Sequence, residues 1–129
     1  DFDPIVIKDG AGLSRANRIA PSQLYEILKK TSLETYFTWI WDALPIAGVD
    51  GTLKNRMQST VAQGKVRAKT GTLAQVSNLV GYIPEYGKNG EITALHPYVV
   101  MSSYKEGLTQ LSRSYQDKMT VSIFKEINE

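Results

Sequence analysis

The chain has 129 residues, of which 42% are hydrophobic and 22% charged, and its formal net charge at pH 7 is +2. This length is enough for one domain with a hydrophobic core, the charge is too small to indicate a nucleic-acid partner, and no run of residues is apolar and long enough to span a bilayer. The absence of cysteine excludes disulfides and cysteine metal sites, and the single histidine, His96, excludes a multi-histidine metal site.

The N-terminal third is predicted to form a structured loop followed by two helices. Residues 9–17 combine two glycines with an aspartate, a serine and an asparagine, which favours turns. Pro21 suits the first turn of a helix that runs to about Lys30. Ser32 is a predicted N-cap for a second helix, whose apolar residues recur at helical spacing until Pro45 ends it. These apolar residues are Leu33, Tyr36, Phe37, Ile40, Trp41 and Leu44.

The middle of the chain is predicted to contain a short, weak helix and then a meander of three antiparallel strands. The helix spans about residues 52–62, and the strands span about residues 65–72, 76–83 and 92–102. An Asn-Gly pair at Asn89 favours a hairpin between the second and third strands. Pro97 lacks a donor for the strand ladder, so the third strand is expected to lie at an edge or a bulge there.

A last helix is predicted from about Leu108 to Ile127, after Gly107. Its apolar face is predicted to comprise Leu108, Leu111, Tyr115, Met119, Ile123 and Ile127, with Ser122 beside Ile123. That face would cover one side of the sheet. The predicted fold class is therefore α+β, with helices around a three-stranded antiparallel meander.

The stretch Lys69-Thr70-Gly71-Thr72, at the end of the first predicted strand, carries the clearest chemical signal. Side chains alternate between the faces of a strand, so Lys69 and Thr70 can share one site only on an edge strand that twists at Gly71. An open edge also offers unpaired backbone groups to an extended peptide. The ammonium and hydroxyl groups suit a carboxylate, and backbone N–H groups suit an oxyanion. The alternative interpretation is a solvated strand end.

Three stretches of the chain carry a further signal: residues 9–17 (Asp-Gly-Ala-Gly-Leu-Ser-Arg-Ala-Asn), residues 44–53 with Arg56, and residues 64–73 with residues 78–83. Taken in order, they resemble low-molecular-weight penicillin-binding proteins. The greatest similarity is to peptidase family S13, the D-alanyl-D-alanine carboxypeptidase/endopeptidase family. The third stretch contains the Lys-Thr-Gly box of penicillin-binding proteins and serine β-lactamases. The similarity covers nearly the whole chain, although Ala11 replaces the usual serine of the family.

This resemblance implies serine acyl-enzyme chemistry without a cofactor. In the family, the serine of an S-x-x-K motif attacks the penultimate D-alanine of a peptidoglycan stem peptide, and β-lactams acylate the same serine. For this chain it implies that Lys69 orders the proton network and that Thr70 and Thr72, with Gly71 between them, bind the terminal carboxylate. The backbone N–H of Thr72 would be one of two oxyanion donors.

The resemblance also implies a second motif in the N-terminal loop. Ser14 would pass a proton to the leaving amine, and Asn17 would bind the amide of the substrate. The general form of this motif is S-x-N, and here the asparagine comes one place later. Either Ala16 or Asn17 could therefore occupy the structural slot of the motif.

The nucleophilic S-x-x-K motif is expected before the box, but both matches in this chain follow it. They begin at Ser102, near the end of a predicted strand, and at Ser122, inside the last helix, so we interpret both as structural. We expect residues 1–129 to be the C-terminal part of one penicillin-binding, transpeptidase-like domain that lacks its N-terminal strands and its nucleophile helix. The third strand would then be an exposed sheet edge.

The expected partners are peptidoglycan stem peptides, β-lactam antibiotics and the missing N-terminal part of the same protein. The expected location is the periplasm or cell envelope, after an upstream signal peptide. Three alternatives remain: a β-lactamase or esterase relative, a non-catalytic peptide-binding module of the same fold, and a metabolic enzyme with His96 as general base. Turnover of penicillin would identify the first alternative, and the absence of an upstream S-x-x-K would identify the second.

Overall fold

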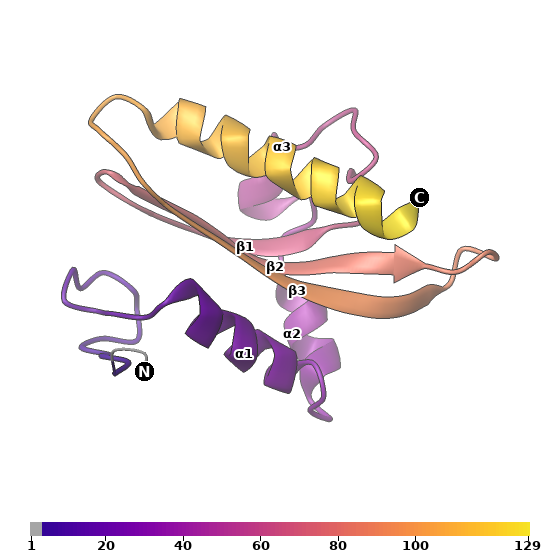
Figure 1. Cartoon of the computed structure of the whole chain (residues 1–129), viewed down its shortest axis with the longest axis horizontal. Helices are drawn as coiled ribbons and strands as arrows, with labels where there is room; N and C mark the ends of the chain where they lie inside the picture. The colour runs from indigo at the N-terminus through magenta and orange to yellow at the C-terminus, as the bar shows by residue number, and fades with distance from the viewer. Residues whose placement is uncertain (1–3) are drawn as a thin grey trace.

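The computed structural model describes residues 4–129, in which a three-stranded sheet lies between helices (Figure 1). The elements in chain order are α1 (Pro21–Thr31), α2 (Phe37–Ala43), the 3-10 helix η1 (Gly51–Leu53), β1 (Arg67–Leu73), β2 (Val76–Tyr86), β3 (Ile92–Ser103) and α3 (Thr109–Asn128). All strand pairs are antiparallel, and the strand order is β1-β2-β3. The predicted α+β class and meander are therefore confirmed.

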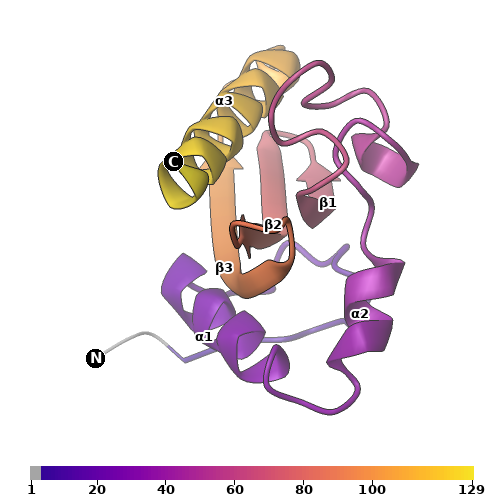
Figure 2. The same cartoon turned by 90° about the vertical axis from the view of Figure 1, so that its right-hand side faces the viewer.

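The two faces of the sheet are covered by different helices. Helix α3 lies across one face, and α1 and α2 lie on the other (Figures 1 and 2). Strands β1 and β3 form the two edges of the sheet. Pro97 lies in the edge strand β3, as its missing backbone donor predicts. None of the helices within residues 4–129 combines the length and the apolar character that crossing a membrane requires.

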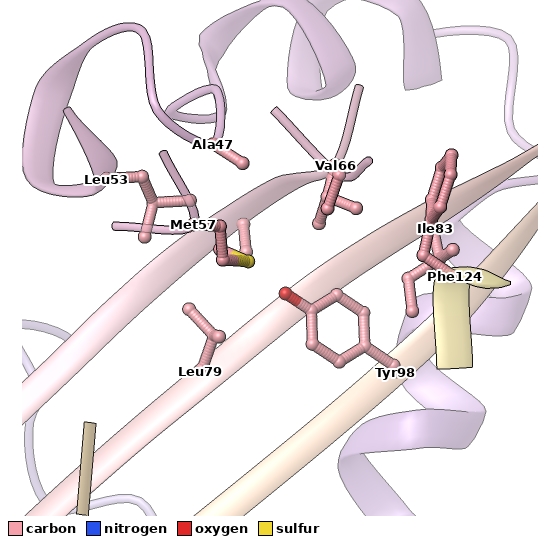
Figure 3. Close-up of a cluster of buried hydrophobic side chains, with 10 residues drawn as sticks. Ala47, Leu53, Met57, Val66, Leu79, Ile83, Tyr98 and Phe124 are labelled. Carbon is pink, nitrogen blue, oxygen red and sulfur yellow. The ribbon is translucent and has the colours of Figure 1, made fainter. Parts of the chain in front are cut away.

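The main hydrophobic core lies between the sheet and α3 (Figure 3). Leu79 and Ile83 of β2 alternate with residues of the opposite face, as the period of a strand requires. Phe124 of α3 packs against this layer. The segment between α2 and β1 closes the side of the layer. The buried members are Ala47, Leu53, Met57, Ala62, Val66, Ala68, Leu79, Ile83, Tyr98 and Phe124.

Helix α3 forms where it is predicted, but the face that it buries is different. Its buried residues are Gln116, Thr120 and Phe124, whereas Leu111 and Tyr115 of the predicted apolar face are 51% and 59% exposed. Burial of Gln116 is possible because its amide finds partners: Nε2 donates to the carbonyl oxygen of Ser77 at 2.8 Å. The predicted apolar face is therefore wrong for Leu108, Leu111, Tyr115 and Met119, which are exposed, whereas Ile123 and Ile127 pack against the core as predicted.

On the other face of the sheet, an aromatic cluster joins β2 to the first two helices. The ring of Tyr82 makes edge contacts with Phe37 and Trp41 at centroid distances of 5.0 and 6.4 Å. Its hydroxyl donates to the carbonyl oxygen of Leu28, the last turn of α1, at 3.0 Å. The guanidinium of Arg67 stacks 4.6 Å from the Trp41 ring. The N-terminal helices are thereby fixed against this face of the sheet.

Two predicted helices are shorter than expected. The second helix begins at Phe37 rather than after Ser32, because the Ser32 hydroxyl donates back to the carbonyl of Lys29 at 2.8 Å and completes the end of α1. Of the helix predicted over residues 52–62, only the 3-10 turn η1 forms. Met57 and Ser59 have φ values of 58° and 56°, which a right-handed helix cannot contain.

Candidate functional site

The box lies on β1, an edge strand with a regular register from Arg67 opposite Tyr82 to Leu73 opposite Val76. The first part of its free edge is covered, because the N–H of Ala68 donates to the carbonyl oxygen of Pro45 at 3.0 Å. Alternate residues of an antiparallel strand direct their backbone groups to the same side. The N–H and C=O groups of Thr70 and Thr72 therefore face the free edge, as those of Ala68 do.

Lys69 reaches this edge in a way that differs from the expectation. The paired register is unbroken through Gly71, and Gly71 is not among the glycines with positive φ, so β1 has neither a bulge nor a left-handed residue there. Lys69 and Thr70 lie on opposite faces of β1. The exposed Lys69 side chain instead folds back along the edge, and Nζ donates to the carbonyl oxygen of Thr70 at 2.6 Å. An ammonium group is thus held at the free edge.

The hydroxyl groups of Thr70 and Thr72 line a surface cavity of about 710 Å³ on the α3 side of β1. The hydroxyl of Thr70 donates to Oγ1 of Thr52, beside η1, at 3.0 Å. Arg113 of α3 donates from Nη2 to Oγ1 of Thr72 at 3.3 Å. Two adjacent box hydroxyls are therefore held by residues that lie 18 and 41 positions away in the sequence.

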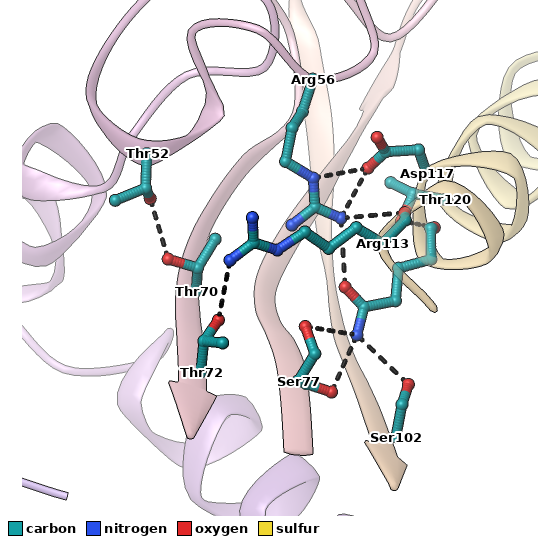
Figure 4. A network of polar contacts seen from close by, with 10 residues as sticks. Thr52, Arg56, Thr70, Thr72, Ser77, Ser102, Arg113, Asp117 and Thr120 are labelled. Atoms are coloured by element: carbon teal, nitrogen blue, oxygen red, sulfur yellow. Dashed lines mark hydrogen bonds and ion pairs between the residues drawn. The ribbon is translucent and has the colours of Figure 1, made fainter. Parts of the chain in front are cut away.

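A buried polar network supports this side of the cavity (Figure 4). Arg56, whose side chain is 11% exposed, forms an ion pair with Asp117 of α3 at 2.7 Å. Its Nη2 also donates to the carbonyl of Arg113 at 3.2 Å and to Oε1 of Gln116 at 3.1 Å. Gln116 in turn donates to Ser77, which is paired with Thr72 across β1 and β2. The network attaches the first turns of α3 to the strand next to the box.

The N-terminal loop holds Asn17 by several hydrogen bonds of its own. The side-chain oxygen of Asn17 accepts from the N–H of Lys8 at 2.7 Å, and its Nδ2 donates to Oδ1 of Asp9 at 3.0 Å. The other carboxylate oxygen of Asp9 accepts from the N–H of Ser14 at 2.8 Å. Ser14 Oγ accepts from the N–H of Ala16 at 3.2 Å. The Asn17 amide thus makes its hydrogen bonds within the loop and joins the two ends of the loop.

Ser14 and Asn17 line a second cavity, of about 530 Å³, together with Asn78 and the ends of the strands. Thr70 and Thr72 line the first cavity and not this one. The loop nevertheless contacts the same end of the sheet, because Arg15 donates to the carbonyl of Ala74 in the β1–β2 turn at 3.1 Å. The roles predicted for Ser14 and Asn17 remain predictions, and the two sets of residues line separate cavities.

The loop carboxylate provides a prediction on pH. The hydrogen bond from Asn17, with backbone N–H donors of Ser14 and Gly12, lowers the pKa of Asp9 below its usual value of 3.8. A lowered pKa means that the ionised carboxylate stabilises the loop at pH values above the usual pKa. This stabilisation is lost as the pH falls through the pKa of the folded state. Exchange of the Gly12 and Ser14 amide protons, corrected for intrinsic exchange, is therefore expected to lose protection below about pH 4. Asp9→Asn should abolish this pH dependence, and unchanged titration in that variant would contradict the assignment.

His96 forms a pair on the sheet surface away from both cavities. Its Nε2 lies 2.7 Å from Oε2 of Glu85, and both side chains are partly exposed, at 43% and 41%. Neither residue lines the cavity of the box hydroxyls or that of Ser14. Within residues 4–129 the structure contains no group of three or more His, Asp or Glu residues that could hold a metal ion.

Comparison with known proteins shows which family and which solved structures this chain is similar to. The model of the D-Ala-D-Ala carboxypeptidase 3 (S13) family matches residues 1–116. Over 98 residues the chain is 43% identical to a D-alanyl-D-alanine carboxypeptidase of Actinomadura sp. (strain R39), which covers 71% of this chain and 18% of that protein. Over 84 residues it is 37% identical to the D-alanyl-D-alanine carboxypeptidase DacB of Haemophilus influenzae, covering 64% and 18%. The chain thus spans about a fifth of the length of these relatives.

Solved structures agree with the sequence comparison. The crystal structure of penicillin binding protein 4 (dacB) from Haemophilus influenzae superposes on 96% of this chain and 28% of its own, with a TM-score of 0.76 and 28% sequence identity. The same protein complexed with a β-lactam covers all of this chain and 30% of its own, with a TM-score of 0.76 and 27% identity.

Proposed function

Since the chain belongs to the D-Ala-D-Ala carboxypeptidase 3 (S13) family, we propose that it forms the substrate-binding part of a serine D,D-peptidase of peptidoglycan. The substrates are stem peptides that end in D-Ala-D-Ala, and the reaction is carboxypeptidase or endopeptidase cleavage. The observation that carries the proposal is the open edge of β1. At this edge the Lys69 ammonium is held by the Thr70 carbonyl. The hydroxyl groups of Thr70 and Thr72 line one cavity beside the edge.

An extended peptide can bind along this edge as an additional strand. The outward N–H and C=O groups of Thr70 and Thr72 supply the main-chain hydrogen bonds. The N–H of Thr72 then donates to the oxyanion of the tetrahedral intermediate, where a preformed donor is most effective. The Thr70 and Thr72 hydroxyls bind the terminal carboxylate, and Lys69 orders proton transfer near the reacting carbonyl. Gly71 keeps the strand free of a side chain where the peptide approaches.

The nucleophile is supplied by a part of the protein outside this chain. Ser102 lies in β3, and its hydroxyl accepts from Nε2 of the buried Gln116 at 3.2 Å, whereas Ser122 lies in α3. Neither is at the start of a helix that faces the box, the context in which an S-x-x-K serine is activated by its lysine. We therefore assign residues 1–129 to one part of a transpeptidase-like domain. The open edge of β3 supports this assignment, because further strands of the domain can pair there.

The roles predicted for Ser14 and Asn17 remain hypotheses, and the hydrogen bonds of the two residues bear on these roles in different ways. The Ser14 hydroxyl accepts one backbone hydrogen bond and can still donate its own proton. The Asn17 amide is bonded to Lys8 and Asp9, so we propose that Asn17 acts mainly by positioning the loop. A loop closed in this way would hold Ser14 and Arg15 beside the β1–β2 turn.

The location of the full-length protein is proposed to be the periplasm or cell envelope, where peptidoglycan is accessible. A β-lactamase or esterase relative would share the same edge and the same cavity. It would release penicillin rapidly rather than remain acylated, so the lifetime of the adduct distinguishes the two. A non-catalytic peptide-binding module would bind the stem peptide but form no adduct in the full-length protein.

Labelling with a tagged penicillin tests the proposal directly. The 129-residue chain alone is expected to form no covalent adduct, because it supplies no activated serine, whereas the full-length protein should form a stoichiometric adduct. Intact-mass measurement after incubation of each protein with the label provides the answer. An adduct on the isolated chain, mapped to Ser102 or Ser122, would overturn the proposal that the nucleophile lies outside this chain. The absence of an adduct on the full-length protein would overturn the proposed serine peptidase activity.

A further inference from the structure

The cavity of the box hydroxyls has an excess of positive charge. Lys54, Arg56 and Arg113 line it, and Asp117 is the acidic residue among the described residues of its wall. Asp117 is already paired with Arg56 at 2.7 Å. The charges of Lys54 and Arg113 are therefore available to an anion that enters the cavity, where partial burial strengthens the interaction relative to bulk water.

Arg113 determines how the Thr72 hydroxyl is oriented. A guanidinium can only donate, so the contact between its Nη2 and Thr72 Oγ1 at 3.3 Å requires the threonine oxygen to accept. The Thr72 proton is then left to donate to a third group. Because the guanidinium has five N–H donors and uses one here, Arg113 and Thr72 together present several donors to one point in the cavity. This set matches a carboxylate, which only accepts.

The backbone of Arg113 is fixed relative to the box. Its carbonyl accepts from Arg56, and Arg56 is held by Asp117 and Gln116 from the next turn of α3. Gln116 bonds to Ser77, the residue paired with Thr72. The relevant residues come together in Figure 4, where Arg113 reaches from α3 toward Thr72. A donor site held in this way loses little entropy when an anion binds.

We propose that Arg113 is a specificity-determining residue, which together with Thr72 recognises the free α-carboxylate at the end of the substrate peptide. The inference rests on the proposed function and deepens it. A guanidinium binds a carboxylate by paired, charge-assisted hydrogen bonds, whereas a C-terminal amide or a continuing chain has no charge to offer. Arg113 therefore favours a peptide with a free α-carboxylate over one in which that carboxyl group is an amide.

The test compares two stem-peptide analogues that differ only at the end, a D-Ala-D-Ala carboxylate and its C-terminal amide, with full-length protein. In Arg113→Gln, kcat/KM for the carboxylate analogue is expected to fall about 10- to 100-fold, mainly because KM rises. This is the range expected when a hydrogen bond between charged groups is lost. The amide should change less than about twofold, and Arg113→Lys should restore part of the preference. Lys105→Gln removes the same charge from an exposed position outside the cavity and should behave as wild type.

The outcomes separate the two proposals. If the wild-type protein cleaves neither analogue, the proposed function is wrong and this inference falls with it. If it cleaves the carboxylate but Arg113→Gln keeps the wild-type preference over the amide, Arg113 does not determine specificity. An equal loss on both analogues in Arg113→Gln, accompanied by a lower melting temperature and no rescue by Arg113→Lys, would show a structural role and overturn the inference.

Discussion

Replacement of Lys69 by alanine is expected to slow acylation of the full-length protein by penicillin about 100- to 10,000-fold, the range for losing a group that orders proton transfer. The Lys69 ammonium is held at the free edge of β1 by the Thr70 carbonyl, and its side chain is exposed. Truncation should therefore leave the core intact and change the free energy of unfolding by less than about 1 kcal/mol. The rate of adduct formation, followed by mass spectrometry, and a thermal melt measure the two effects.

Two further variants separate charge from shape at this position. Lys69→Met keeps a long apolar stem without the ammonium and should be as slow as the alanine variant. Lys88→Ala removes a lysine from the exposed turn between β2 and β3 and should acylate at the wild-type rate. Wild-type acylation of Lys69→Ala would mean that the edge of β1 is not the reacting site.

Substitution of Gly81 by alanine is expected to be the most destabilising single methyl addition in the sheet. A Cβ at Gly81 would collide with the carbonyl oxygen of Arg67 and would lie 2.6 Å from the Cα of Ala68. These are backbone atoms of the neighbouring strand, so no side chain can move aside. Overpacking usually costs about 1–3 kcal/mol, and a clash with a paired backbone belongs at or above the upper end of that range.

Gly71→Ala is the matched control for this prediction. Gly71 lies on the strand opposite, and a Cβ there would meet Asn78 at 3.7 Å, an ordinary contact. Its expected effect on the free energy of unfolding is less than about 1 kcal/mol. Denaturant unfolding of both variants measures the two free energies of unfolding. The dependence of this free energy on denaturant concentration is determined for each variant separately. Equal losses in the two variants would contradict the close approach of β1 and β2 at Gly81.

The same two glycines illustrate how the sheet holds the box in place. Gly81 allows β1 to approach β2 directly beside Lys69, so its substitution should also disturb acylation. Gly71 is not needed by the fold of the chain, because its φ is ordinary and space is available beside it. Packing within the described chain therefore does not require a glycine at this position.

The strands could be predicted from the sequence because their signals are local. Alternation, the Asn-Gly turn and the position of Pro97 each depend on neighbouring residues, and β1, β2, β3 and α3 begin and end close to the predicted positions. The edge position of β1 was also predictable from the chemistry of the box. Spacing was less informative for the second helix, because Leu33, at the start of the apolar series, is 83% exposed in the structure.

The buried face of α3 could not be predicted from the apolar spacing of its residues. Leu111 and Tyr115 satisfy the apolar spacing but lie outside, whereas Gln116 and Thr120 lie inside. Polar residues can be buried only when partners satisfy them, and the partners of Gln116 include Arg56 and Ser77, which are 60 and 39 positions away. A periodic pattern within one helix carries no information about such distant partners.

For the candidate site, the chemical groups could be identified from the residues alone: Lys69, two hydroxyls around Gly71, and their place at the end of a strand. How these groups are arranged depends on the folded chain. It separates Lys69 from Thr70 by the faces of β1, folds the ammonium back along the edge, and brings Arg113 to Thr72. It also places Ser14 and Asn17 at a separate cavity. The physical reason is that backbone alternation is local, whereas hydrogen-bond partners and cavity walls come from segments that meet only after the chain has folded.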